Sequence, residues 1–244
     1  TVQDNSTLKV VQVYGASYVN VNTATSEGII RASELGLVPS SLPDVVFSPL
    51  FGEVLTKLYS RKHSAKLIVT MRHPVDREVA VYSYMKSATW DPGYKAEVAS
   101  MSLEEYALSS NIDNNYVTRL LTGKSGGALK EVDLNVAKEI LRQKAIVGIY
   151  EALQSSMDHI EKYFGWTPLD ETAQRCIAKV VADGVLKGTV EKLDTGSTAY
   201  ALIAQQNQFD IQLYDYVRNF LVPYQREVVS RQLEAKSAPP IVET

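Results

Sequence analysis

Apolar and polar positions follow their clearest pattern between residues 65 and 92. Lys66 to Met71 is a short apolar run rich in β-branched side chains, and the Arg-His-Pro sequence at 72–74 ends it, which predicts a buried strand. Pro74 suits the first turn of a helix, where its missing N–H is not needed. Apolar residues then recur at helical spacing and predict the face that packs on the sheet: Val75, Val79, Tyr82 and Met85.

The residues before this unit predict two strands, two helices and a further short strand. The expected elements are strands over 8–14 and 18–23 joined at Gly15-Ala16-Ser17, a helix from Thr25 or Ser26 to Leu35, a strand over 44–48 and a helix over 51–59. These elements lead the chain to the strand that precedes Arg72.

The residues after this unit predict mostly helices. Ser102 with Glu105 three positions later is a capping-box pattern. Further helices are expected over 114–122, 134–144, 152–164, 171–182 and 199–233, with Pro223 breaking or kinking the last, and a strand over 145–150. An apolar stripe in the last helix is expected in the core: Phe209, Leu213, Tyr216, Val217 and Phe220. Strands separated by helices favour an α/β fold with a mainly parallel sheet.

Composition limits the classes of protein that fit. The 244 residues, 45% of them hydrophobic, suffice for one α/β domain over 1–236, followed by an extended tail over 237–244. Charged residues number 25 basic against 28 acidic, so nothing indicates a nucleic-acid-binding surface. No apolar run reaches the roughly 18 residues of a transmembrane segment. Cys176, the single cysteine, is expected in the core.

The chain does not begin with methionine, which fits a processed or truncated N-terminus. A lumenal location, in an organelle or the secretory pathway, therefore stays open.

Arg72 is the first candidate for chemistry. It follows a buried strand and precedes a helix N-terminus, an arrangement that favours binding of a phosphate or sulfate at the carboxyl end of the sheet. A guanidinium can hold such a group through two hydrogen bonds. The alternative is a structural ion pair between Arg72 and Asp76 or Glu78, and the spacing does not decide between the two.

This segment resembles the 3′-phosphate-binding segment of sulfotransferases, in which an apolar strand is followed by Arg, any residue, Pro, Val, Asp or Glu, Arg, and a Ser one turn on. Other segments between residues 18 and 220 are similar to the carbohydrate-type sulfotransferases of algae and related lineages: residues 88–92, 101–106, 114–123 (NNYVTRLLTG), 136–151 and 207–216 (NQFDIQLYDY). The resemblance implies a P-loop-like sulfotransferase fold that uses 3′-phosphoadenosine 5′-phosphosulfate (PAPS) as donor.

The donor site implied by this resemblance is incomplete. Arg72 corresponds to the residue that binds the 3′-phosphate, but Ala80 stands where the family has its serine. The glycine-containing turn that would bind the 5′-phosphosulfate is not evident, and Gly15-Ala16-Ser17 has neither a basic residue nor a following helix. Gly123-Lys124-Ser125 lies after a helix and lacks the upstream glycine of a nucleotide-hydrolase P-loop. His73 and Glu53 are the candidates for a catalytic base, which is otherwise unknown.

Two hypotheses follow from this pattern. The first is a non-catalytic structural or interaction subunit of a larger assembly that contains other protein subunits and binds no donor. The second is an active PAPS-dependent enzyme with a carbohydrate acceptor, whose 5′-phosphosulfate loop is encoded upstream of Thr1. The aromatic side chains between 82 and 94 are the expected interface, or equally the lip of an acceptor cleft: Tyr82, Tyr84, Trp90 and Tyr94.

Overall fold

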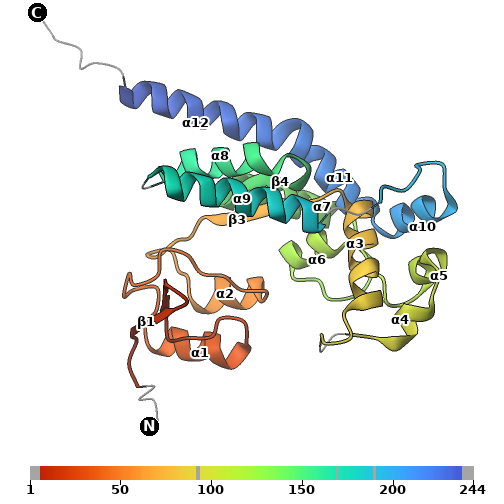
Figure 1. The fold of residues 1–244 in the computed structure, drawn as a ribbon, viewed down its shortest axis with the longest axis horizontal. Helices are drawn as coiled ribbons and strands as arrows, with labels where there is room; N and C mark the ends of the chain where they lie inside the picture. The colour runs from red at the N-terminus through yellow and green to blue at the C-terminus, as the bar shows by residue number, and fades with distance from the viewer. Residues whose placement is uncertain (1–5, 92–93, 169, 189–190, 238–244) are drawn as a thin grey trace, which may run out of the picture. The chain divides into compact units, whose positions relative to one another are not determined.

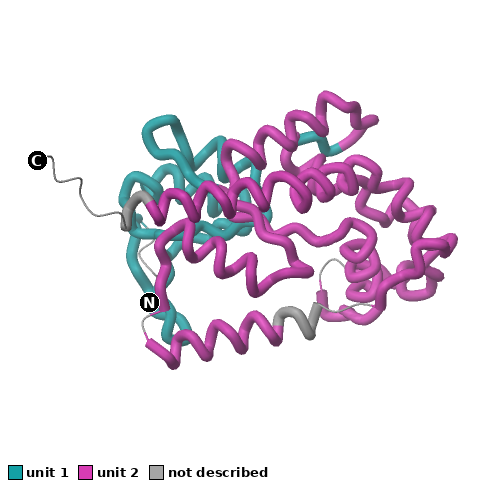
Figure 2. Tube along the Cα trace, turned by 90° about the horizontal axis from the view of Figure 1, so that it is seen from above, with its two compact units in different colours: residues 1–66, 123–125 teal, residues 67–122, 126–244 magenta. Residues whose placement is uncertain are grey.

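The computed structural model describes residues 6–91, 94–168, 170–188 and 191–237, so the expected tail lies almost entirely outside the described residues. The chain forms two compact units (Figure 2). Unit 1 comprises residues 1–66 with 123–125, and unit 2 comprises residues 67–122 and 126–244. Whether both units fold as one domain over 1–236 stays a prediction.

Unit 1 begins with an antiparallel hairpin of β1 (Val10–Val13) and β2 (Ala16–Val19). Tyr14 and Gly15 both adopt positive φ, which suits the tight turn of a two-residue hairpin. α1 (Ser26–Glu34) starts at Thr25, whose side chain accepts the Gly28 amide as an N-cap. Together with α2 (Phe51–Lys57), α1 encloses the core of this unit: Ile29, Ala32, Leu37, Val54 and Leu58.

The strand expected over 44–48 is not formed, so this prediction was wrong. Val45 and Phe47 are exposed, and the Phe47 carbonyl accepts the Thr23 hydroxyl at 2.6 Å. The apolar spacing of this segment therefore does not correspond to a buried sheet face.

Unit 2 contains the strand and helix predicted around Arg72. β3 (Leu67–Met71) pairs in parallel with β4 (Ala145–Ile149), in a register that places Met71 beside Ile149 (Figure 1). α3 (Pro74–Ser87) follows β3, and α7 (Glu131–Lys144) and α8 (Leu153–Phe164) flank β4 in the chain. The α/β class is confirmed, with a parallel sheet that has two strands within the described residues.

The other helices of unit 2 surround this sheet or extend from it (Figure 1). α5 (Leu103–Leu108) starts with the predicted capping box, in which Ser102 and Glu105 exchange side-chain and backbone hydrogen bonds. The remaining elements are α4 (Ala96–Ser100), α6 (Tyr116–Thr122), a 3₁₀ turn (Tyr150–Ala152), α9 (Glu171–Gly188), α10 (Thr198–Gln206), α11 (Gln208–Tyr216), a π-helical turn (Val217–Leu221) and α12 (Val222–Ser237).

The helical region after residue 198 is interrupted twice rather than once. It breaks at Asn207, and the π-helical turn lies just before Pro223. Pro223 has no N–H to donate and its ring crowds the carbonyl four residues earlier, which accounts for a widened turn there. The extra residue of this turn changes which side chains face inward. Val217 is buried but Phe220 is 67% exposed, so its assignment to the core was wrong.

α6 and α11 cap one another through residues far apart in the sequence. The buried carboxylate of Asp210 accepts the amides of Val117 and Thr118, each at 2.8 Å, and the Thr118 hydroxyl at 2.7 Å. In return the side-chain oxygen of Asn115 accepts the amides of Phe209 and Asp210. Each helix thus supplies the partner for backbone N–H groups that the other leaves unpaired.

Gln225 of α12 pairs with the edge of β4 that faces away from β3. Its side-chain nitrogen donates to the Ala145 carbonyl at 2.8 Å, and its side-chain oxygen accepts the Val147 amide at 3.0 Å. These are the two backbone groups that a further strand would use. The amide therefore anchors α12 to the sheet.

Cys176 is exposed on α9, so its assignment to the core was also wrong. α9 packs on α8, which leaves its other side facing solvent. Among the helices of the described residues, none has the length and apolar character needed to span a membrane.

His159 on α8 is buried, and within the described residues its Nε2 atom has no hydrogen-bond partner. Burial, with Arg226 and Lys162 nearby, lowers the pKa of this histidine. His159 therefore binds a proton more tightly in the unfolded chain than in the folded chain, and protonation favours unfolding. The contribution of His159 should lower the free energy of unfolding as the pH falls below about 6.5.

We expect His159→Leu to lose less stability than the wild type between pH 7 and pH 5. Urea unfolding at the two pH values measures this difference, and His63→Gln in unit 1 is the control. A His159→Leu variant whose stability falls as steeply as that of the wild type would contradict the expectation.

Candidate functional site

The carboxyl ends of β3 and β4 lie side by side because the strands are parallel and in register. Arg72 follows Met71, and Tyr150 follows Ile149, so both stand at the same edge of the sheet. The Arg72 guanidinium lies over the Tyr150 ring, 4.9 Å from its centroid. This stacking orients the guanidinium without using its N–H donors.

Arg72 does not form the structural ion pair that was the alternative. Glu78 pairs with Arg77, and the other terminal nitrogen of Arg77 donates to Asp113 at 2.8 Å. Among the described residues, no carboxylate forms an ion pair with Arg72. Its donors are therefore available to an anion, beside the N-terminus of the fourteen-residue helix α3.

Glu151 fixes the backbone next to Arg72. Its carboxylate accepts the His73 amide at 2.8 Å through one oxygen and the Tyr214 hydroxyl at 2.9 Å through the other. Burial and this carboxylate raise the pKa of Tyr214, so the phenol stays a hydrogen-bond donor. The contact joins the end of β4 to the start of α3 and to α11.

The His73 ring lies between two tyrosines. It meets Tyr214 edge-on at 5.3 Å and stacks on Tyr200 at 6.5 Å between centroids. Arg72 and His73 are thus brought to one edge of the sheet, as the sequence predicts. The aromatic neighbours of His73 come from α10 and α11 and were not anticipated, because no local pattern connects residue 73 with residue 200 or 214.

The other predicted site residues belong to other elements of the chain. Glu53 is on α2 of unit 1, where it accepts the Ser26 hydroxyl at 2.7 Å. Ala80 is half-buried on α3 and supplies no hydroxyl. Gly15 forms the turn of the β1–β2 hairpin and is followed by a strand. Gly123 comes directly after α6 with φ of 70°, so neither glycine segment has the strand–loop–helix order of a phosphate-binding loop.

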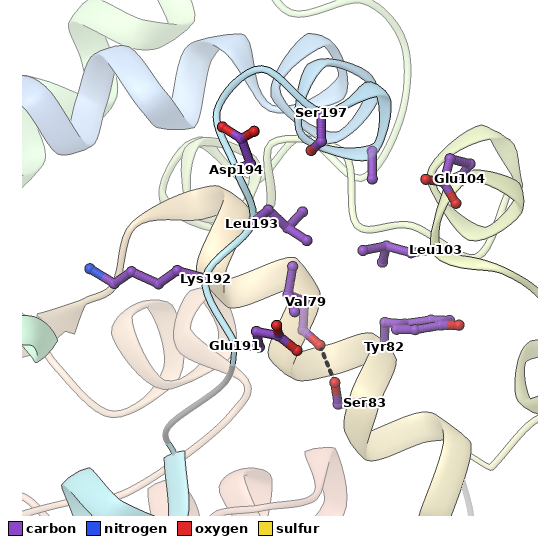
Figure 3. A pocket seen from close by; sticks show the side chains of 11 residues that line it. Val79, Tyr82, Ser83, Leu103, Glu104, Glu191, Lys192, Leu193, Asp194 and Ser197 are labelled. Carbon is purple, nitrogen blue, oxygen red and sulfur yellow. Dashed lines mark hydrogen bonds between the residues drawn. The ribbon is translucent and has the colours of Figure 1, made fainter.

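The four aromatic candidates occupy different environments. Tyr84 and Trp90 are 50% and 76% exposed, and the Tyr84 hydroxyl donates to Asp91 at 2.6 Å. Tyr94 is half-buried. Tyr82 lines a pocket of about 620 Å³ (Figure 3). Its hydroxyl donates to the Met101 carbonyl at 2.7 Å.

A buried acid beside Arg77 is the feature that sequence reasoning missed. Glu78 is fully buried, pairs with Arg77 and accepts the Tyr106 hydroxyl at 3.2 Å. Desolvation raises the pKa of Glu78 to about 7, although the charge of Arg77 opposes this shift. A carboxylate near the start of a helix is expected at the solvent-exposed surface from sequence alone, whereas the packing of α5 on α3 buries Glu78.

Within the described part of the chain, no group of three or more histidine, cysteine, aspartate or glutamate side chains could hold a metal ion. At the sheet edge, the Arg72 guanidinium, the first turn of α3 and the tyrosines around them are groups that a ligand could contact. Comparison of the chain with protein-family models, with curated proteins and with solved structures found no match in any of the three.

Proposed function

We propose that this chain is a sulfotransferase-like protein that binds a phosphate or sulfate group through Arg72 and acts as a non-catalytic binding subunit of a larger assembly. The observation that carries the binding part is the guanidinium held against Tyr150, free of carboxylate partners among the described residues and next to the start of α3. The ligand chemistry expected from the resemblance is the 3′-phosphate of a PAPS-type nucleotide.

Two features support the non-catalytic part of the proposal. Ala80 provides no hydroxyl where the family has serine, so one hydrogen bond to the 3′-phosphate is missing. Gly15, the nearest candidate for the 5′-phosphosulfate turn, belongs to a hairpin. The proposal keeps the role of an interaction subunit from the first hypothesis of the sequence analysis. Unlike that hypothesis, it includes an anion-binding site at Arg72.

Calorimetric titration of the chain with adenosine 3′,5′-bisphosphate tests the binding part. We expect saturable binding that Arg72→Ala weakens at least about tenfold, because hydrogen bonds to a charged group contribute roughly 1.5–3 kcal/mol. Arg142→Ala, on the exposed side of α7, is the matched control and should bind as the wild type does. Adenosine 5′-monophosphate, which lacks the 3′-phosphate, should bind more weakly.

A folded chain that shows no binding at millimolar nucleotide would contradict the anion site. Incubation with PAPS and carbohydrate acceptors tests the non-catalytic part of the proposal. We expect no sulfate transfer. Transfer that depends on Arg72 would instead support the active enzyme, the second hypothesis from the sequence.

A further inference from the structure

The pocket that Tyr82 lines is separate from the edge of the sheet. Its walls come from α3, α5, the segment 191–197 and the start of α10 (Figure 3). At about 620 Å³ it falls within the roughly 300–1,000 Å³ of small-molecule pockets. Its apolar surface is formed by five side chains: Val79, Tyr82, Leu103, Leu193 and Ala199.

The hydroxyl groups around the pocket already have partners. Ser83 donates to the Val79 carbonyl at 2.8 Å, and Ser197 accepts the Tyr200 amide at 3.2 Å as the cap of α10. Asp194 accepts the Gly196 amide at 3.1 Å. These contacts stabilise the walls of the pocket. They therefore do not indicate which chemical groups a ligand of the pocket would carry.

The carboxylates of Glu104 and Glu191 remain for a ligand. They lie on opposite sides of the pocket, with the apolar side chains of Val79 and Leu103 between them (Figure 3). Neither forms an ion pair with any described residue. Lys192, the one basic side chain of the lining, points away from the pocket (Figure 3).

We propose that this pocket binds an aliphatic di- or polyamine, with an ammonium group at each of Glu104 and Glu191 and the methylene chain over the apolar surface between them. Two separated carboxylates match two separated ammonium groups, and the apolar surface buries the chain that connects those groups. A divalent metal ion would instead need the carboxylates together on one centre. The inference does not depend on the proposed function.

Calorimetric titration of the full chain with spermidine, putrescine and butylamine tests this proposal. We expect both polyamines to bind saturably, and butylamine, which carries the single charge of one lysine side chain, to bind at least about fivefold more weakly. Glu104→Gln and Glu191→Gln should each weaken spermidine binding about two- to fivefold, as solvent-exposed ion pairs do. The double variant should weaken spermidine binding by roughly 4- to 25-fold, the product of the two single effects.

Glu97→Gln is the matched control, because Glu97 is an exposed acid on α4 outside the pocket lining. It should bind spermidine as the wild type does. Equal weakening by Glu97→Gln, unchanged binding in the double variant, or equal affinity for butylamine and putrescine would each overturn the proposal. Loss of nucleotide binding in Arg72→Ala with spermidine binding retained would show that the two sites are independent.

Discussion

Replacing Arg77 by alanine should lower the free energy of unfolding by about 3–5 kcal/mol at pH 8, the cost of leaving a buried charge without its partner. Arg77 is the ion-pair partner of Glu78, which is fully buried. It also donates to Asp113 and stacks 4.1 Å from the centroid of the Tyr116 ring. Urea unfolding monitored by circular dichroism measures the loss.

The loss in Arg77→Ala should depend on pH. The pKa of Glu78 is raised to about 7 in the folded chain, against about 4.5 when unfolded, so the neutral acid is favoured by folding. That contribution is fully present below pH 4.5 and is lost as the pH rises through about 7. Without Arg77, protonation removes the unpaired charge, and the destabilisation should be clearly smaller at pH 5 than at pH 8.

Three variants distinguish this explanation from a loss of packing. Arg77→Ala combined with Glu78→Gln should recover most of the stability, because the side-chain amide introduced at this position carries no charge. Arg142→Ala, which breaks the exposed pair with Glu139, should change stability by less than about 1 kcal/mol. If Arg77→Ala lowers the free energy of unfolding equally at pH 5 and pH 8, the lost contact with Tyr116 would explain the effect instead.

Asp210→Ala should be the second strongly destabilising change, with a loss of about 3 kcal/mol or more, since each buried donor left unpaired costs roughly 1–3 kcal/mol. The substitution removes the acceptor for two backbone amides of α6 and for the buried Thr118 hydroxyl. Thermal or urea unfolding provides the measurement.

Asp215→Ala is the matched control for this change, since Asp215 is exposed on the same helix. It should stay within about 0.5 kcal/mol of the wild type. Asp210→Asn keeps one acceptor oxygen and should fall between the two. Similar stability for Asp210→Ala and Asp215→Ala would mean that the links between α6 and α11 contribute little to folding.

Local signals predicted the elements that depend on neighbours in the sequence. The β-branched run before Arg72 became β3, Pro74 became the first residue of α3, and Ser102 formed its capping box with Glu105. In each case the responsible residues lie within one or two turns, so their spacing contains the information. The strand edge that carries Arg72 follows from the same reasoning, because β4 was also recognised as an apolar run.

Features that depend on distant segments were not predictable in this way. Asn115 and Asp210 cap the helices of each other's segments across about ninety residues of sequence, and no local pattern connects the two positions. The exposure of Phe220 depends on one extra residue in a π-helical turn, which helical spacing does not reveal. The absence of a strand over 44–48 likewise reflects tertiary packing rather than local preference.

The pairing of Gln225 with β4 has a consequence for behaviour at high protein concentration. An open strand edge offers unpaired N–H and C=O groups to any extended chain, and such edges lead to intermolecular sheets. The amide of Gln225 occupies the Ala145 carbonyl and the Val147 amide, the groups through which an incoming strand would begin to add. A glutamine in the last helix thus protects a fully apolar strand from self-association while the sheet itself stays small.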